Sequence, residues 1–386
     1  MIAITHGKLL TVANGTIEDG TLLIDNGKIT AIGKDIAIPQ GAEILDASGK
    51  WVTPGLIDAH THISTFNEPH WMPHIGDGNE VTSPVTAQIR GIDALNPFDM
   101  AIGAARSAGF TTCYTGPGSA NPISGQGIVI KTLGAWVDQM VLKAPATMKM
   151  ALGENPKTVY NGRKETPTTR MGTASVIRTE LARALEYMDR QDKADTEAGT
   201  NAPGYDPRLE ALIPVLRGEL PVHIHAHRAD DMATGIRICK EFGLEYVIVH
   251  GTEGHLIANE LARGGARVIT GPCLGDRSKP ELANMSLETP VLLAMAGVKI
   301  AICTDHPETP VQYLPLCAAM AVKGGLPADA ALAAITIWAA EIGGVAHRVG
   351  SLTPGKDGDV VVMSGHPLNW LSRVSAVVVD GRRVTE

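Results

Sequence analysis

The middle of this chain alternates short apolar segments with helix-like segments, and this alternation restricts the fold more than any other feature. Segments with strand character recur at 56–62, 111–115, 127–131, 147–152, 222–226, 246–250, 267–271 and 299–304. Helix-like stretches separate several of them, at 98–108, 173–190, 231–242, 254–263 and 289–296. Eight strands alternating with helices indicate an α/β fold and fit a parallel (β/α)8 barrel better than an open sheet. The polar, basic insert at 154–170 is too long for an ordinary connection, so we expect a functional loop there.

Both ends of the chain are instead rich in short β segments. Asp25-Asn26-Gly27 separates two strand-like runs near the N-terminus, and Asp380-Gly381 separates two more near the C-terminus. Asn-Gly and Asp-Gly tolerate the positive φ angles of a type I′ turn, so both sites predict hairpins. We therefore expect residues 1–54 and 355–386 to form one composite β-sandwich domain beside a barrel domain at 55–354.

Composition and charge exclude several classes of protein. Apolar residues make up 44% of the 386 positions and charged residues 19%, a balance that allows a large core and is untypical of disordered chains. The net charge of -8 argues against general binding to nucleic acid or to an anionic membrane. Lys299 interrupts the longest apolar run, so no transmembrane segment is expected. Scattered cysteines without a C-x-x-C pair and the lack of a signal-peptide pattern predict reduced thiols and a cytoplasmic location.

Two histidines end the first barrel strand. His60 and His62 are two positions apart, so both imidazoles point to the same face of the strand. At the C-terminal mouth of a barrel, that face meets the place where barrel enzymes carry out their chemistry. Two surface histidines in a turn are the alternative. The apolar run before them and the histidines that end later strands favour a metal site instead.

Further histidines end the fifth and sixth strands. His223, His225 and His227 alternate along the fifth strand, and His225 is the best placed as a metal ligand because it lies near the strand end. His223 lies deeper, as a core residue or as a support for the ligands, and His227 is expected where the strand turns outward. His250 ends the next strand, where a lone histidine is more often a core or rim residue than a ligand.

Two charged residues follow or interrupt apolar strands, where neither can stay unpaired. Asp305 ends the eighth strand, and a buried carboxylate needs a cation, a hydrogen-bond donor or a proton. A metal ion is the partner that also accounts for the converging histidines. Lys149 interrupts the fourth strand, where an ammonium group is costly unless it is paired, neutral or modified. If Lys149 faces the barrel axis, carbamylation by CO₂ would make it a bridge between two metal ions; if it faces outward, it would extend to solvent. Glu154 is the rival bridging carboxylate.

These residues together resemble the amidohydrolase superfamily. The run Pro54-Gly55-Leu56-Ile57-Asp58-Ala59-His60-Thr61-His62 is similar to its first-strand signature, and the segment 350–359 resembles its re-entry into the small β domain. His225, His250 and Asp305 match its later ligands in order. The fifth-strand pair His225 and His227, with His250-Gly251 and a fourth-strand lysine, is most similar to the imidazolonepropionase-related branch, which includes prolidase-like and carboxypeptidase-like enzymes.

The resemblance implies a distorted (β/α)8 TIM barrel with a small composite β-sandwich. It implies that His60, His62 and Asp305 bind the more buried metal ion, that His225 and His250 bind a second one, and that carbamylated Lys149 bridges the two. Zn²⁺ suits these ligands, and Mn²⁺, Fe²⁺ or Co²⁺ are alternatives. The implied reaction is hydrolysis of a C–N amide bond by metal-activated hydroxide, with Asp305 as general base and then acid. The expected substrate is a dipeptide, an N-acyl amino acid or a cyclic amide.

One departure from the family bears on the alternatives. Imidazolonepropionases and many deaminases of this family carry an acidic residue shortly after the fifth-strand histidine, where this chain has His227-Arg228. That difference argues against both activities. The runner-up is an aminohydrolase that deaminates a heterocycle with one metal ion and an unmodified Lys149. A third hypothesis is a non-catalytic relative that keeps the barrel as an assembly module. The full set of candidate metal ligands argues against it.

The substrate is expected to be a small molecule that carries a carboxylate. Basic residues gather in the insert and after the fifth strand: Lys157, Arg163, Lys164, Arg170 and Arg228. Cations at the catalytic face of an acidic protein indicate carboxylate recognition, although a solvated loop with ordinary charges is the alternative. The candidate substrate contacts are Arg170, Arg228, His227 and Glu154.

Two further loops are expected to shape the pocket. One is 64–80, with Phe66, His70, Trp71 and His74, and the other is the glycine-rich 116–127. The second loop lacks the lysine and the spacing of a nucleotide-binding motif. Barrels of this kind often associate, so self-association into a homo-oligomer is left open.

Overall fold

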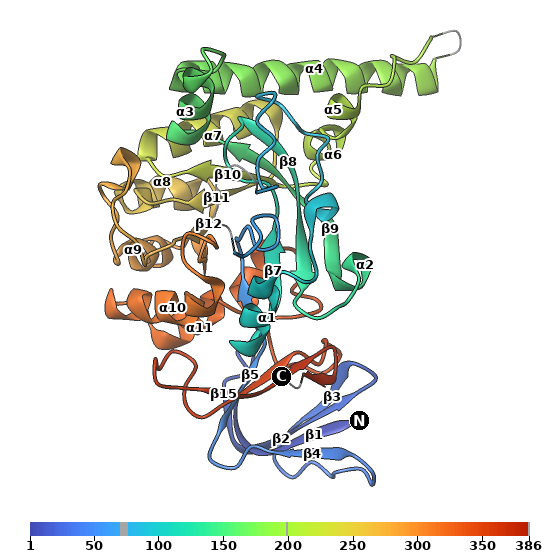
Figure 1. Cartoon of the computed structure of the whole chain (residues 1–386), viewed down its shortest axis with the longest axis vertical. Helices are drawn as coiled ribbons and strands as arrows, with labels where there is room; N and C mark the ends of the chain where they lie inside the picture. Colours follow the sequence, from blue (N-terminus) through green and yellow to red (C-terminus); the bar gives the residue numbers. More distant parts are fainter. Residues whose placement is uncertain (70–75, 198–199, 385–386) are drawn as a thin grey trace.

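The computed structural model describes residues 1–69, 76–197 and 200–384. Figure 1 shows a barrel with its helices above a smaller β-sheet region that holds both chain termini. The smaller sheet contains β1 (Ile2–Leu10), β2 (Thr16–Asp25), β3 (Lys28–Gly33), β4 (Glu43–Asp46), β5 (Trp51–Pro54), β14 (Val360–Met363), β15 (Val374–Val379) and β16 (Arg382–Val384). The two ends of the chain therefore build one β region together, as the sequence predicts, and its strands pair into one connected sheet.

β1 organises this smaller sheet. It pairs with antiparallel β2 on one edge, and on the other edge with parallel β4 near its start and parallel β5 near its end. Both predicted hairpins are confirmed, because Asn26-Gly27 joins β2 to β3 and Asp380-Gly381 joins β15 to β16, with positive φ at all four residues. An apolar cluster from both ends fills the interior of this region. The predicted domain limits, 1–54 with 355–386 and 55–354, stay a prediction.

The second sheet is the nearly closed barrel. Its strands are β6 (Leu56–Asp58), β7 (Phe110–Thr115), β8 (Ile123–Lys131), β9 (Val141–Ala151), β10 (Val222–Ala226), β11 (Tyr246–His250), β12 (Arg267–Thr270) and β13 (Lys299–Ile302), paired in chain order. Each predicted strand overlaps one of them. Beyond the ends of β6 and β13, the backbone N–H of Asp305 donates to the carbonyl of His60 at 3.1 Å and the N–H of His62 donates to that of His306 at 2.7 Å. The predicted TIM-like barrel is confirmed.

The barrel is not wholly parallel, so this part of the prediction is wrong. β8 runs antiparallel to both β7 and β9. A parallel connection needs a crossover of about a dozen residues or more, usually through a helix. The link from β7 to β8 at 116–122 is shorter and contains no helix, so the chain must reverse direction there.

Helices pack around the barrel and, at one end, against its interior. They are α1 (Met100–Ser107), α2 (Val137–Met140), α3 (Glu154–Gly162), α4 (Arg170–Thr196), α5 (Pro207–Glu210), α6 (Ile213–Leu216), α7 (Ala229–Phe242), α8 (Ala258–Arg263), α9 (Thr289–Met295), α10 (Leu314–Lys323), α11 (Ala328–Ala334) and α12 (Ile337–Ile342). Short 3₁₀ turns add η1 (Gly91–Ala94), η2 (Gly254–Ile257), η3 (Pro280–Leu282) and η4 (Val311–Tyr313). None of the helices in the described ranges is long and apolar enough to span a bilayer.

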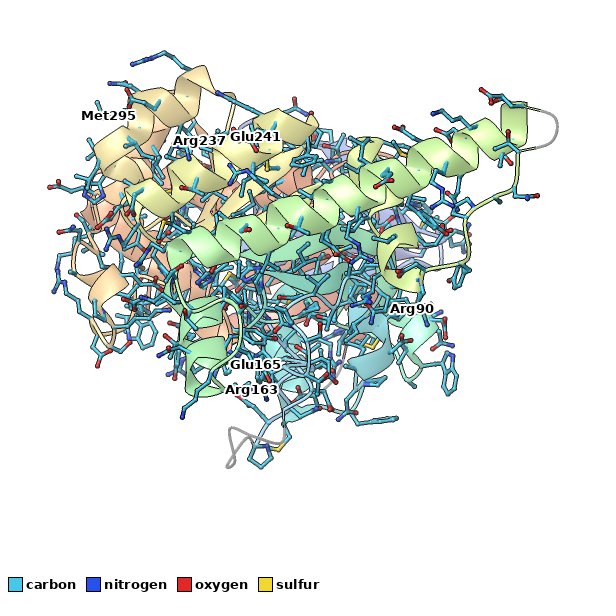
Figure 2. All side chains as sticks on the ribbon, turned by 90° about the horizontal axis from the view of Figure 1, so that it is seen from above. Arg90, Arg163, Glu165, Arg237, Glu241 and Met295 are labelled. Atoms are coloured by element: carbon cyan, nitrogen blue, oxygen red, sulfur yellow. The ribbon has the colours of Figure 1, made fainter. Side chains whose placement is uncertain are left out.

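The insert at 154–170 was expected to be a loop, but much of it is helical. Glu154 lies in the first turn of α3, where a negative charge favours the helix N-terminus. Pro156 and Tyr160, four positions apart, share the buried face of that helix. The insert continues into α4, which lies beside α7 in Figure 2, and Arg178 of α4 pairs with Glu241 of α7. The predicted loop is therefore a packed wall of the barrel mouth.

Candidate metal centre

A first cluster joins the two strands that close the barrel. His60 and His62 follow β6, and Asp305 follows β13. The Nε2 atoms of both histidines lie 3.4 Å from the same oxygen, Oδ1 of Asp305. His60 is completely buried, and the side chain of Asp305 is only 14% exposed. This arrangement brings together all three residues that the resemblance assigns to the more buried metal ion.

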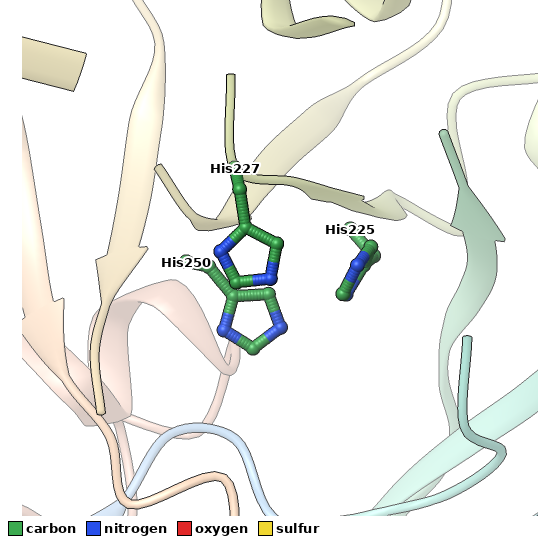
Figure 3. Close-up of side chains that lie close together, drawn as sticks. All are labelled: His225, His227 and His250. Atoms are coloured by element: carbon green, nitrogen blue, oxygen red, sulfur yellow. The ribbon is translucent and has the colours of Figure 1, made fainter. Parts of the chain in front are cut away.

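A second cluster contains His225 and His227 from the end of β10 and His250 from the end of β11 (Figure 3). The rings of His227 and His250 stack with centroids 4.5 Å apart, and the ring of His225 lies 4.6 Å from that of His250 at a steep angle. His227 was expected to turn outward, but it is buried and points into the cluster. The Nε2 atom of His250 lies 3.9 Å from Oδ2 of Asp305, so Asp305 lies between the two clusters.

Hydrogen bonds at the far side of three rings orient them toward the centre. The Nδ1 atoms of His62 and His250 lie 2.8 Å from the carbonyl oxygens of Gly116 and Gly271, respectively, and Nδ1 of His227 lies 2.7 Å from the hydroxyl of Thr252. Such contacts fix the tautomer and leave Nε2 free toward the interior, as in metal-ligating histidines. Burial, partly opposed by Asp305, lowers the pKa of His250 to about 4, which keeps its ring neutral and able to ligate.

Several buried polar atoms of the two clusters have no hydrogen-bond partner within the described residues. They include Nδ1 of His60, Nδ1 of His225 and Oδ1 of Asp305. Buried polar groups are costly without a partner, and a divalent cation is a suitable partner for imidazole nitrogen and carboxylate oxygen. Burial raises the pKa of Asp305, but His250, His60 and His62 more than offset this and hold it well below its usual value. The donor set therefore fits divalent metal ions.

Lys149 faces the interior of the barrel, beside His60 of the first cluster. It is completely buried, and its Nζ lies 3.1 Å from Nε2 of His60. Burial lowers the pKa of Lys149 to about 8, with Asp305 opposing the shift. A substantial neutral fraction of this amine is therefore present near physiological pH. His223, opposite Lys149 in the β9–β10 pairing, is deeply buried, as the sequence suggests.

The backbone at two of these positions is strained. His250 has φ of 75° and Asp305 has φ of 53°, values in the left-handed region that few residues other than glycine adopt. Asp and His tolerate this region better than most residues do. Strain of this kind persists where the surrounding structure enforces it, and it is concentrated at functional sites.

A cavity of about 660 Å³ opens from the two clusters. Its wall includes side chains from several segments: His62, Phe66, Asn79, Ser119, Glu154, Asn155, His225, His227, Lys279, Asp305 and Glu308. Phe66 and Asn79 come from the predicted loop 64–80, and Ser119 comes from 116–127. His70, Trp71 and His74 lie outside the described residues. Glu154 lines the wall and belongs to neither cluster.

The two predicted arginine contacts lie elsewhere. Nε of Arg170 is 3.0 Å from Oδ1 of Asp231, and Arg228 forms a bidentate pair with Asp230 at 2.9 and 2.8 Å. Neither arginine is among the residues that line the cavity. The structure therefore does not bring them together with the two clusters.

Sequence reasoning missed two polar residues that line the cavity, Asn155 and Lys279, and the buried Glu281 behind them. Oε1 of Glu281, a buried side chain, lies 3.7 Å from Nε2 of His227 and 3.0 Å from Nζ of Lys279. Nζ of Lys279 also lies 3.3 Å from Oδ1 of Asn155. Lys279 and Glu281 lie in the segment after the seventh strand, at the barrel face where such segments build active sites, and that location was the one available signal.

Known proteins resemble this chain over most of its length. The model of the amidohydrolase family matches residues 51–384. Amidohydrolase tasK of Hapsidospora irregularis is 31% identical over 388 residues, which covers 94% of this chain and 39% of that protein, so the chain spans about two fifths of its length. Imidazolonepropionase of Geobacillus kaustophilus is 27% identical, with 91% of this chain and 85% of that protein covered.

Solved structures give the same result. The crystal structure of an amidohydrolase from Thermotoga maritima is 42% identical, covers 100% of both chains and has a TM-score of 0.97. A prolidase complexed with N-methylphosphonate-L-proline has a TM-score of 0.63 at 18% identity, a likeness of fold alone. Because the family model covers most of the sequence and the superposition extends over the whole chain, this protein belongs to the amidohydrolase family.

Proposed function

We propose that the chain is a metal-dependent hydrolase that cleaves a C–N amide bond in a small molecule. The observation that carries this proposal is the position of Asp305 between two clusters of buried histidines, at the end of a cavity of about 660 Å³. A purely structural site would not need so many buried nitrogen and oxygen atoms without a hydrogen-bond partner.

His60, His62 and Asp305 would hold one metal ion, His225 and His250 would hold a second, and Lys149 would bridge them as a carbamate. The buried position and lowered pKa of Lys149 support this modification, because only the neutral amine reacts with CO₂. Zn²⁺ is the proposed metal, since imidazole and carboxylate are ordinary zinc ligands. When bound, such ions lower the pKa of water to about 7 and polarise a carbonyl group.

The protein's own residues have three roles in the proposed reaction. Asp305 is ionised, so a carboxylate oxygen can accept the proton of the attacking water. Asp305 then gives this proton to the leaving nitrogen. Gly116, Thr252 and Gly271 hold the histidine rings in place. Phe66, Leu274 and Met285 give the cavity wall an apolar portion that limits water around the substrate.

The proposed substrate is a dipeptide, an N-acyl amino acid or a cyclic amide, with a carboxylate as a recognition group. A cytoplasmic location, two structural domains with the limits predicted above and self-association belong to the same proposal. The five free cysteines are consistent with a reducing compartment.

A one-metal deaminase is the second candidate, and one observation favours it. The sequence lacks the acidic residue expected shortly after the fifth-strand histidine, yet Glu281 supplies a buried carboxylate 3.7 Å from Nε2 of His227. A carboxylate in this position would supply the acid–base group that His227-Arg228 does not provide.

The products distinguish the two candidates. Zinc-loaded protein is incubated with dipeptides, N-acyl amino acids, cyclic amides and amino-substituted heterocycles, and free ammonia is assayed separately from amine or carboxylate release. The proposed hydrolase releases amino acid, or opens a ring, without ammonia. Ammonia release from the heterocycles alone would favour the deaminase, and no product from any class would contradict both.

A further inference from the structure

Lys279 is the one lysine or arginine among the described residues that line the cavity. Its side chain is 29% exposed. Its Nζ lies 3.0 Å from Oε1 of Glu281 and 3.3 Å from Oδ1 of Asn155. Only the contact with Asn155 is a hydrogen bond, and the contact with Glu281 is an ion pair. An ammonium group has three N–H donors, so at least one donor remains for a group in the cavity.

Both partners of Lys279 are themselves held by further hydrogen bonds, so the position of the ammonium group is fixed. Oε2 of Glu281 accepts a hydrogen bond from the backbone N–H of Glu154 at 3.0 Å. Asn155 donates through Nδ2 to the hydroxyl of Ser119 at 2.8 Å. Lys279 is thus connected to the start of α3 and to the 116–127 loop. A donor ordered before binding costs less conformational entropy when a ligand arrives.

The remaining charges on the wall restrict where an anion can bind. Glu154, Asp276 and Glu308 line the same cavity, and the contacts of the described residues give their side chains no ion pair. A substrate carboxylate is repelled by these groups and attracted by the ammonium group of Lys279. The charge pattern therefore leaves Lys279 as the favoured point of contact for an anion on the cavity wall.

Lys279 is also close to the second histidine cluster. Oε1 of Glu281 lies 3.0 Å from Nζ of Lys279 and 3.7 Å from Nε2 of His227. The carboxylate of Glu281 therefore contacts Lys279 on one side and lies near His227 on the other. A substrate that contacts Lys279 and reaches the clusters needs only a short spacing between its carboxylate and its scissile amide. An amino-acid residue, with its carboxylate on the carbon next to the amide nitrogen, has such a spacing.

We propose that Lys279 recognises the substrate carboxylate, and that the substrate class is an N-acyl amino acid or dipeptide cleaved at the amide next to its carboxyl-terminal residue. This inference rests on the proposed hydrolase function. It assigns to Lys279 the role that the sequence suggests for Arg170 and Arg228.

The test measures binding with probes that cannot be cleaved. Levulinate and 3-benzoylpropionate are the isosteres of N-acetylglycine and N-benzoylglycine in which CH₂ replaces the amide N–H, and each has a carboxamide that differs mainly in charge. Calorimetry compares each acid with its amide on four zinc-loaded proteins. These are the wild type, Lys279→Met, the double variant Lys279→Met/Glu281→Gln, and Arg228→Met as the rival site. The double variant removes the buried charge that Lys279→Met alone leaves unpaired.

The wild type is expected to bind the acids at least about tenfold more tightly than the amides, the range of one charge-assisted hydrogen bond. Both Lys279 variants are expected to lose this preference and Arg228→Met to keep it. If Lys279→Met does not fold, the double variant decides. No preference in the wild type, a preference that survives without Lys279, or a preference lost in Arg228→Met would overturn the proposal. Hydrolysis of the dipeptides, N-acyl amino acids and cyclic amides of the product assay is measured separately. If the wild type prefers the acids but cleaves none of these compounds, the hydrolase is rejected and the role of Lys279 is retained. If it cleaves them without preferring the acids, the hydrolase is retained and the role of Lys279 is rejected.

Discussion

Nζ of Lys149 lies 3.1 Å from Nε2 of His60, at a point in the barrel that solvent does not reach. Two nitrogen groups so close together stabilise the fold only if one is neutral and accepts from the other, or if a further group joins them. Carbamylation would convert this amine into a carboxylate-like group that could ligate a metal ion. The first prediction concerns this residue.

Replacement of Lys149 by Met is expected to reduce the metal content from about two ions per chain to one or fewer, because the proposed carbamate bridge could not form. Elemental analysis of purified protein measures it directly. Lys143→Met is the matched control, since Lys143 lies on the same strand but outside both clusters. Unchanged metal content in Lys149→Met would show that Lys149 does not bridge.

Replacement of Asp305 by Asn is expected to preserve much of the metal content while kcat falls by about 10²- to 10⁴-fold, the usual contribution of a general base. Steady-state kinetics on the substrate identified in the product assay test this. Asp93→Asn, which changes a surface ion pair with Arg90, serves as the control. Near-normal turnover in Asp305→Asn would remove Asp305 from the proton-transfer role.

Removal of the metal ions is expected to lower Tm as well as activity, because the buried nitrogen atoms of both clusters would lose their partners. Scanning calorimetry before and after 1,10-phenanthroline measures the shift, and added Zn²⁺ should restore it. An apo-protein with the Tm of the loaded protein would indicate that no structural metal is bound there.

Acid stability is expected to depend on Asp357, which lies between the barrel and the smaller sheet. Asp357 lies 2.6 Å from Nζ of Lys28, 3.0 Å from Nζ of Lys131 and 2.8 Å from Nη2 of Arg348. Burial raises the pKa of Asp357, but the hydrogen bond with Lys28 and the charge of Lys131 outweigh it and lower the pKa to about 2. A carboxyl group with a lowered folded pKa stabilises the fold above its unfolded value of 3.8 and loses that effect as the pH falls.

Asp357→Asn is therefore expected to reduce the free energy of unfolding by about 2 kcal/mol at pH 7. The difference from the wild type should shrink between about pH 5 and pH 2. Urea titrations at several pH values give this difference, with Asp93→Asn as the surface control. A difference that stays constant down to pH 2 would rule out this linkage.

The sequence predicts the strand-end residues of the site because two simple regularities apply. Side chains two apart share a face, which pairs His60 with His62, and barrel strands end at one mouth, which brings His225, His250 and Asp305 to the same place. The direction of β8 does not follow from such patterns, since an apolar strand reads alike in either direction. Its short connection to β7 is what sets the direction.

The side chains of the cavity wall that we propose to contact the substrate are harder to predict, because their positions depend on contacts between distant segments. Arg170 and Arg228 are at plausible positions in the sequence, but Asp231 and Asp230 pair with them at the start of α7. Lys279, Glu281 and Asn155 meet from two segments more than a hundred residues apart, and no local motif marks them. Ion-pair partners of this kind are chosen by the three-dimensional fold, so charge clustering along the chain is a weak guide.

The central claim is a pair of metal ions between the two clusters, and metal content per chain tests it most directly. The protein is purified without chelator in bicarbonate buffer, and metal and protein are quantified together. The account predicts about two divalent ions per chain, with zinc as the main metal. About one ion would leave Lys149 as an unmodified structural residue and favour the deaminase, and none would contradict the metal centre altogether.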